Sequence, residues 1–161
     1  MNYFKSKLYR LFLRKRFFEN SIKDWHLRDF SNFEKKILTL QYFCDITPEN
    51  SDIIECGVGA GATTNLLCRL SKASNRRYFA FDTFSGFPDG IKEDNWFRSK
   101  NKEIYKCFSV DYIKEQLKNS SATDEEINSI NFKKGLFKDT FSEYDGLPGF
   151  VFIDVDLYES Y

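Results

Sequence analysis

Residues 52–64 read DIIECGVGAGATT, and the rest of the chain is interpreted around this stretch. Ile53 and Ile54 form a short β-branched apolar run that is typical of a buried strand, and Ala62 opens a helical pattern. Three glycines stand at alternate positions between them: Gly57, Gly59 and Gly61. Because glycine adopts positive φ angles and lets a ligand come close to the main chain, the stretch predicts a strand, a ligand-binding turn and a helix.

Glu55 lies at the expected carboxyl end of this first strand. Burial of a carboxylate is costly unless it meets a partner, and a cationic or hydroxyl-bearing ligand would supply one. The N–H groups at the start of the following helix would favour a polar or anionic part of that ligand. A glycine turn alone is a weak signal, so a purely structural strand-to-helix turn is the alternative.

The composition fits one compact domain, since 42% of the 161 residues are hydrophobic and 18% are aromatic. The formal net charge is zero, but residues 1–30 carry eight basic and three acidic residues, which gives this segment +5 and the remainder −5. A cationic arm on an acidic body argues against a general nucleic-acid binder.

Cysteine and histidine usage gives no sign of a zinc site or a disulfide framework, because the chain has four widely spaced cysteines, no CxxC pair and one histidine. We expect Cys56 and Cys68 to be small buried residues. No apolar run reaches the roughly 18–20 residues that span a bilayer, and the start lacks the features of a signal peptide. The cytoplasm is therefore the expected location.

The N-terminal part, residues 1–48, is expected to be helical and to precede a domain over residues 49–161. Residues 2–18 mix aromatic and basic side chains in a helical pattern, which fits a membrane-surface helix, or a helix that covers the domain or a dimer partner. We favour the covering helix, and we leave a homo-oligomer open. Ser31 and Glu34 form a capping-box pattern that predicts a helix over residues 31–43.

Further elements follow the glycine turn. We expect helices over residues 62–73 and 111–119 and from Thr123 onward, and strands over residues 77–83 and 131–134. Asp82 lies 21 residues beyond Gly61 at the end of the second strand, where a carboxylate can accept both hydroxyls of a ribose. A turn or helix-capping aspartate is the alternative.

Residues 149–158 read GFVFIDVDLY and form the second chemical stretch. The apolar run 150–153 predicts a strand covered on both faces. Asp154 and Asp156 stand two apart, so an extended chain would direct both carboxylates to one side, where they could bind a metal or act as a base. An exposed strand end is the alternative. Because carboxyl ends of parallel strands share one edge, we expect these two residues to gather with Glu55 and Asp82.

Four stretches in this order resemble the class I S-adenosylmethionine-dependent methyltransferases, and within them the macrocin O-methyltransferase group, which methylates sugar hydroxyls. The stretches are IIECGVGAGATT, FDTFSGFPDG, KGLFKDTF and FIDVDLYES, at residues 53–64, 81–90, 134–141 and 152–160. The resemblance implies an α/β fold with a Rossmann-like, mainly parallel sheet and flanking helices.

The resemblance also implies roles for the site residues. Glu55 and the three glycines would hold the methionine end of the cofactor, and Asp82 with Thr83 would hold its ribose. Asp154 would ligate Mg²⁺, and Asp156 would be the base for a small-molecule hydroxyl acceptor. Substrate specificity would come from residues 85–108 and the N-terminal helices.

The family pattern continues with a helix, a fifth strand with an acidic pair that completes the metal site, and a closing hairpin. This sequence stops before them, so we expect an incomplete sheet and weak Mg²⁺ binding by the 161-residue chain. Two other functions remain open. Gly57, Gly59 and Ala62 also satisfy the GxGxxA form of an NAD-dependent oxidoreductase, and a non-catalytic cofactor-binding remnant would need no acceptor.

Overall fold

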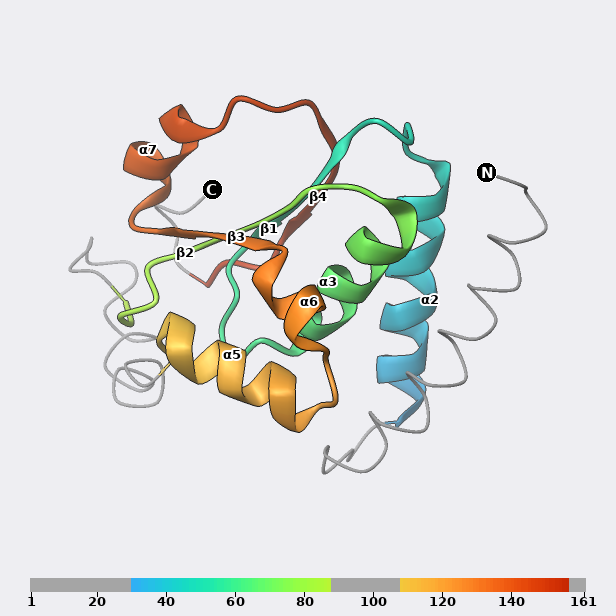
Figure 1. The fold of residues 1–161 in the computed structure, drawn as a ribbon, viewed down its shortest axis with the longest axis horizontal. Coiled ribbons are helices and arrows are strands. Elements are labelled where there is room, and N and C mark those ends of the chain that lie inside the picture. Colours follow the sequence, from blue (N-terminus) through green and yellow to red (C-terminus); the bar gives the residue numbers. More distant parts are fainter. Residues whose placement is uncertain (1–29, 88–107, 157–161) are drawn as a thin grey trace.

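The computed structural model describes residues 30–87 and 108–156, and the N-terminal segment 2–18 and much of the loop 85–108 lie outside them. The described elements, shown in Figure 1, are the following: α2 (Phe30–Ile46), β1 (Asp52–Cys56), α3 (Ala62–Ser74), β2 (Tyr78–Asp82), α5 (Val110–Asn119), α6 (Asp124–Asn128), β3 (Ile130–Lys134), α7 (Phe137–Thr140), η2 (Phe141–Glu143) and β4 (Pro148–Ile153). The four strands are parallel and lie in the order β3-β2-β1-β4. The fold is therefore α/β with a Rossmann-like parallel sheet, as the sequence predicts.

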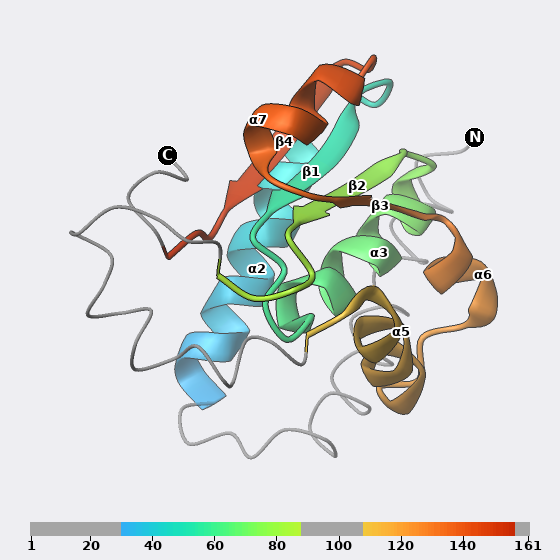
Figure 2. The same ribbon diagram turned by 90° about the vertical axis from the view of Figure 1, so that its left-hand side faces the viewer.

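One face of the sheet carries the main hydrophobic core. Figure 2 shows α2, α3, α5 and α6 on this side of the sheet. Ile53 of β1 and Ala80 of β2 point into this core and are fully buried, as are Leu67 of α3 and Ile113 of α5. Burial of a side chain of this size stabilises a fold by about 1.5–3 kcal/mol, so the helices hold the sheet mainly through this layer.

The opposite face is covered by the segment α7–η2. Because side chains alternate along a strand, Ile54 and Cys56 of β1 project to this side together with Phe79 and Phe81 of β2. Tyr144 follows η2 and meets Phe79 edge to face, with ring centroids 5.0 Å apart. The sequence analysis did not predict α7 or η2, which contain only four and three residues.

Local sequence signals account for several element boundaries. Ser109 caps α5 by accepting a hydrogen bond from the Tyr112 N–H. Thr123 and Glu126 form a complete capping box at α6, in which each side chain bonds the other residue's main chain. The capping signal at Thr123 is confirmed, and the predicted helices and strands in the described part of the chain lie within a few residues of the observed bounds.

β4 corrects one prediction, because it is not covered on both faces. Phe150 is buried in the main core and Phe152 packs against it, whereas Val151 and Ile153 are 47% and 55% exposed. The apolar run identified a strand, but burial depends on what packs on each side. Within residues 30–87 and 108–156, α2 packs against β4 and the face with Val151 and Ile153 is largely exposed.

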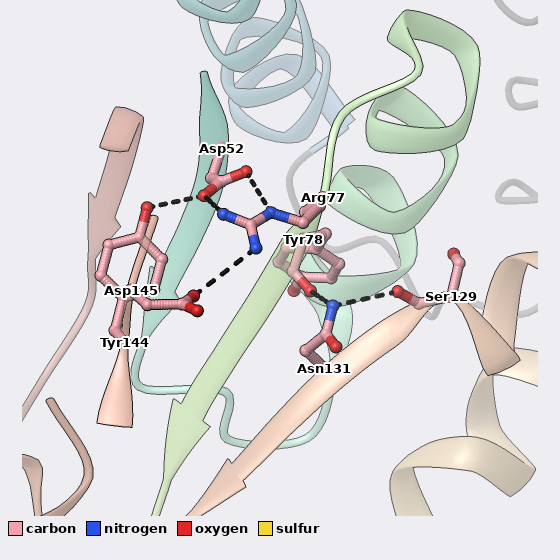
Figure 3. Close-up of polar contacts among 7 residues, drawn as sticks. All are labelled: Asp52, Arg77, Tyr78, Ser129, Asn131, Tyr144 and Asp145. Carbon is pink, nitrogen blue, oxygen red and sulfur yellow. Dashed lines mark hydrogen bonds and ion pairs between the residues drawn. The ribbon is translucent and has the colours of Figure 1, made fainter. Parts of the chain in front are cut away.

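Polar contacts tie the sheet together at the amino ends of its strands, as Figure 3 shows. Arg77 precedes β2 and donates two hydrogen bonds to Asp52 of β1, at 3.0 and 2.7 Å. The Tyr144 hydroxyl donates to the same carboxylate at 2.8 Å. Asn131 of β3 donates to the Tyr78 carbonyl at 3.0 Å, which fixes the start of β2 from its other side.

None of the helices in the described ranges is long and apolar enough to cross a membrane. The predicted division of the chain at residue 48 stays a prediction, because most of its N-terminal part lies outside these ranges.

Candidate functional site

The glycine loop, residues 57–61, follows β1 at the carboxyl edge of the sheet. β1 continues through α3 to β2 on one side, and its other neighbour is β4. The strand order reverses between β1 and β4, and in open α/β sheets ligands bind at such a switch point. Residues 57–61 follow one of these two strands and residues 154–156 follow the other.

Gly57 is required by the close approach of the chain that follows β4. Its φ is 87°, and a Cβ built on it would lie 2.1 Å from the Asp154 carbonyl oxygen. The Asp154 N–H donates to the Cys56 carbonyl at 2.9 Å, so the two segments continue to pair just beyond the strands. Gly57 therefore serves this main-chain contact, a role that the sequence analysis had assigned to a ligand.

Gly59 and Gly61 face different surroundings. Gly61, with φ of 86°, precedes α3, and its position packs against Ile113 of α5. A Cβ on Gly59 would meet nothing within 4 Å. Of the three glycines, Gly59 alone borders open space, which is the feature expected where a ligand approaches the loop.

Glu55 lies beneath the loop and is fully buried. Its Oε2 accepts a hydrogen bond from the Thr64 hydroxyl of α3 at 2.7 Å and another from the Tyr78 hydroxyl of β2. Its Oε1 is buried without a hydrogen-bond partner within the described residues. A buried carboxylate oxygen that lacks a donor is costly, so Oε1 offers an acceptor for a donor that a ligand would bring.

The electrostatic environment of Glu55 shifts its titration. Burial raises the pKa of this carboxyl, whereas the hydrogen bonds from Tyr78 and Thr64 lower it, and the result is a pKa of about 7. The charge of Lys36 also lowers this pKa, and that of Asp82 raises it. Glu55 is thus near the midpoint of its titration at neutral pH, and a nearby cation would favour its ionised form.

Asp82 holds the shape of the glycine loop. Its Oδ2 accepts from the Val58 N–H at 2.8 Å and from the Gly59 N–H at 3.4 Å. Its Oδ1 accepts from the Phe84 N–H at 2.9 Å and from the Thr83 hydroxyl at 3.3 Å. A carboxylate offers about four acceptor positions, so a ribose would have to replace the two longer contacts.

Thr83 has a hydrogen bond of its own within the loop after β2. Its hydroxyl donates to the Gly86 carbonyl at 2.6 Å, which is much shorter than its contact with Asp82. Because a hydroxyl has a single hydrogen, this donation leaves Thr83 acting on a ligand mainly as an acceptor.

Asp154 and Asp156 lie beyond the end of β4 at Ile153. The expectation that both project to one side of a strand is therefore wrong, because the pairing of β1 with β4 ends at Cys56 and Ile153. Both residues are exposed.

Lys36 of α2 is the nearest cation that the structure records at this edge. Its Nζ lies 3.5 Å from the Asp154 Oδ2 and 5.0 Å from the centre of the Phe152 ring. No group of three or more potential metal ligands occurs within residues 30–87 and 108–156. These residues alone do not form a metal site.

The structure brings the expected residues to the same edge but at different depths. Asp82 and Asp154 flank the glycine loop, Glu55 is buried beneath it, and Asp156 is exposed beyond β4. The sequence analysis missed Lys36, Thr64 and Tyr78. Thr64 stands nine residues after Glu55 and Tyr78 lies on the same side of the sheet, but the pattern of neither residue marks a carboxylate partner.

The parallel sheet, the glycine loop at its switch point and the buried carboxylate define a cofactor-binding α/β domain. Among solved structures, nine chains match, including the O-methyltransferase NovP, with a TM-score of 0.63 and 24% sequence identity. That match covers 78% of this chain and 55% of the NovP chain, so this chain spans little more than half the length of its structural neighbour. The likeness shows a shared fold.

The family follows from the sequence match. The profile of the Macrocin-O-methyltransferase (TylF) family matches residues 41–161, which is most of the chain. The chain belongs to this family, as the four sequence stretches predict. No curated protein matches it significantly.

Proposed function

We propose that this protein is an S-adenosylmethionine-dependent O-methyltransferase that acts on a hydroxyl of a sugar or a related small molecule. Family membership supports the reaction class. The observation that carries the cofactor assignment is the buried Glu55, whose Oε1 has no donor in the described part of the chain, beneath a loop with open space at Gly59. A ligand with an ammonium group and a thioether or sulfonium chain fits both features.

The proposed cofactor contacts follow from these positions. Glu55 would accept a hydrogen bond from the ammonium group of the methionine part, and Gly59 would let the ligand approach the main chain. Asp82 would accept from the ribose hydroxyls in place of its two longer contacts, with the Thr83 hydroxyl beside it. When bound, the cofactor supplies an electrophilic methyl group on a sulfonium centre.

The acceptor would lie near residues 154–156. Methyl transfer is an in-line substitution, so the protein contributes chiefly by positioning the reactants and by removing the hydroxyl proton. Asp156 is the proposed base. Asp154 has the hard oxygen that Mg²⁺ prefers and is the proposed metal ligand, but its recorded partner is Lys36 and the described residues form no metal cluster. The proposed reaction therefore has no step through a metal.

Cofactor identity is tested by titrating the 161-residue chain separately with S-adenosylhomocysteine and with NADH, followed by calorimetry. We expect saturable binding of S-adenosylhomocysteine and none of NADH, because NADH lacks the amino-acid ammonium that would pair with Glu55. Binding of NADH alone would establish the oxidoreductase alternative instead.

The base is tested by Asp156→Asn, which keeps the side-chain size and removes the proton acceptor. We expect turnover of a hydroxyl acceptor to fall by at least about a hundredfold, with the affinity for S-adenosylhomocysteine nearly unchanged. The measurement is methyl transfer from labelled cofactor across a panel of sugars. An active Asn variant would remove Asp156 from this role, and cofactor binding without transfer to any acceptor by the unmodified chain would favour a non-catalytic binding protein. A cytoplasmic location stays a prediction from the sequence.

A further inference from the structure

We propose that Tyr78 and Thr64 are positioning residues: their hydroxyls hold one oxygen of Glu55 and thereby reserve its other oxygen for the ammonium group of a bound amino-acid ligand. This inference rests on the proposed function, because that function requires such a ligand. It adds a role for a residue on the neighbouring strand that no feature of the glycine loop would indicate.

The geometry of the two hydrogen bonds is the main support. Tyr78 and Thr64 approach Glu55 from β2 and α3 respectively, and all three residues are fully buried. Both hydroxyls donate to the same atom, Oε2. An oxygen of a carboxylate accepts about two hydrogen bonds, so Oε2 is filled while Oε1 keeps its full capacity.

The main chain around Tyr78 fixes its hydroxyl in place. Tyr78 pairs with Ile53 of β1 on one side and with Ile130 of β3 on the other. Its carbonyl also accepts the hydrogen bond from the Asn131 side chain that Figure 3 shows. Two neighbouring strands therefore hold the residue that orients Glu55.

The other titratable groups around Glu55 come from each element packed against it. They are Lys36 of α2, Asp82 of β2, and the thiols of Cys56 in β1 and Cys68 in α3. Burial raises the pKa of the Cys56 thiol to about 11 and that of the Cys68 thiol to about 12. Both thiols are therefore neutral across the pH range in which Glu55 titrates.

The pH dependence of binding distinguishes positioning from simple packing. An ammonium group pairs with the ionised carboxylate, so affinity should rise as pH increases through the Glu55 pKa of about 7. Each hydroxyl donor favours the ionised form. Removal of a donor raises this pKa further, and the rise in affinity should then move to higher pH.

The experiment measures binding of two probes from about pH 5.5 to about pH 8.5. S-adenosylhomocysteine carries the ammonium group, and 5′-methylthioadenosine shares the nucleoside but lacks the amino acid. The variants of the 161-residue chain are Tyr78→Phe, Thr64→Val and the conservative Thr64→Ser, which keeps the hydroxyl. Tyr144→Phe is the matched control, because it also removes a tyrosine-to-carboxylate hydrogen bond but at the opposite edge of the sheet (Figure 3).

We expect Tyr78→Phe and Thr64→Val each to weaken S-adenosylhomocysteine binding about tenfold at pH 7 and to move its pH profile upward. Methylthioadenosine binding should stay the same, and Thr64→Ser and Tyr144→Phe should keep the profile of the unmodified chain. The two hydroxyls are tested independently, so a failure of one variant to fold leaves the other decisive.

Two results would overturn the inference while leaving the proposed function intact. One is an unchanged profile for S-adenosylhomocysteine in both hydroxyl-deletion variants. The other is an equal loss of both probes, which would indicate a packing role. If neither probe binds the unmodified chain, the proposed function fails and the inference fails with it.

Discussion

At the scale of single residues, Gly57 and Gly59 stand two positions apart and meet different constraints. Gly57 leaves no room for a side chain, because the Asp154 carbonyl would lie 2.1 Å from its Cβ. Gly59 has a φ of 53° and open space beside it. The left-handed conformation costs a non-glycine residue about 1–2 kcal/mol, whereas a clash with main chain forces the surrounding structure to move.

This contrast predicts opposite outcomes for two alanine substitutions. Gly57→Ala should destabilise the fold by more than about 3 kcal/mol, and Gly59→Ala by about 1–2 kcal/mol while weakening S-adenosylhomocysteine binding. Urea unfolding and calorimetry measure the two effects. Equal stability losses in the two variants, or full affinity in Gly59→Ala, would contradict the assigned surroundings.

Single residues also show where sequence reasoning stops. The glycines and Asp82 could be predicted because their types and spacing are restricted by a turn after a parallel strand. Tyr78 and Thr64 could not, because a tyrosine near the start of a strand and a threonine in a helix have many uses. Their contact with Glu55 depends on the register that places Ile53 beside Tyr78.

At the scale of elements, the contacts around Asp52 join β1, β2 and the segment before β4. Arg77 is about half exposed, whereas the Asp52 side chain is only 6% exposed. Burial raises the Asp52 pKa, but the hydrogen bonds from Arg77 and Tyr144 and the charge of Arg77 outweigh it, so the pKa lies below its usual value. The stability that this lowered pKa contributes is present above pH 3.8 and is lost as pH falls through the folded-state pKa.

Removal of the two partners should therefore have unequal consequences. Arg77→Met leaves a buried carboxylate without its cation and should cost about 3 kcal/mol or more, whereas Asp52→Asn leaves a half-exposed arginine that water can solvate and should cost less. In Arg77→Met the burial effect dominates, so acid unfolding should shift to lower stability at neutral pH and to little further loss below pH 4. Urea unfolding at pH 7 and pH 4 measures both. A larger loss for Asp52→Asn would contradict this account.

Elements with a clear period were predictable, and those defined by their surroundings were not. The helices over 62–73 and 111–119 follow from apolar periodicity and caps, and the strands from short apolar runs. α7 and η2 are too short to show a period. The coverage of β4 failed as a prediction because Val151 and Phe150 have the same apolar character but face different neighbours.

At the scale of the whole molecule, chain order alone explains why distant residues meet. A glycine loop near residue 57 and an aspartate near residue 154 follow neighbouring parallel strands, so the fold brings them to one edge (Figure 1). The sequence analysis could predict this edge from the strand pattern. It could not predict that Glu55 lies below the surface, because depth is set by the helices that pack over the strand.

The contact between Gly57 and the Asp154 carbonyl has a mechanical consequence. Because main chain rests on main chain at this point, the loop after β1 and the segment after β4 behave as one stiff body with no flexible side chain between them. The spacing between the two halves of the switch point is therefore built into the backbone. Adaptation to ligands of different size would have to come from the peripheral segments, while the separation of these two strand ends stays constant.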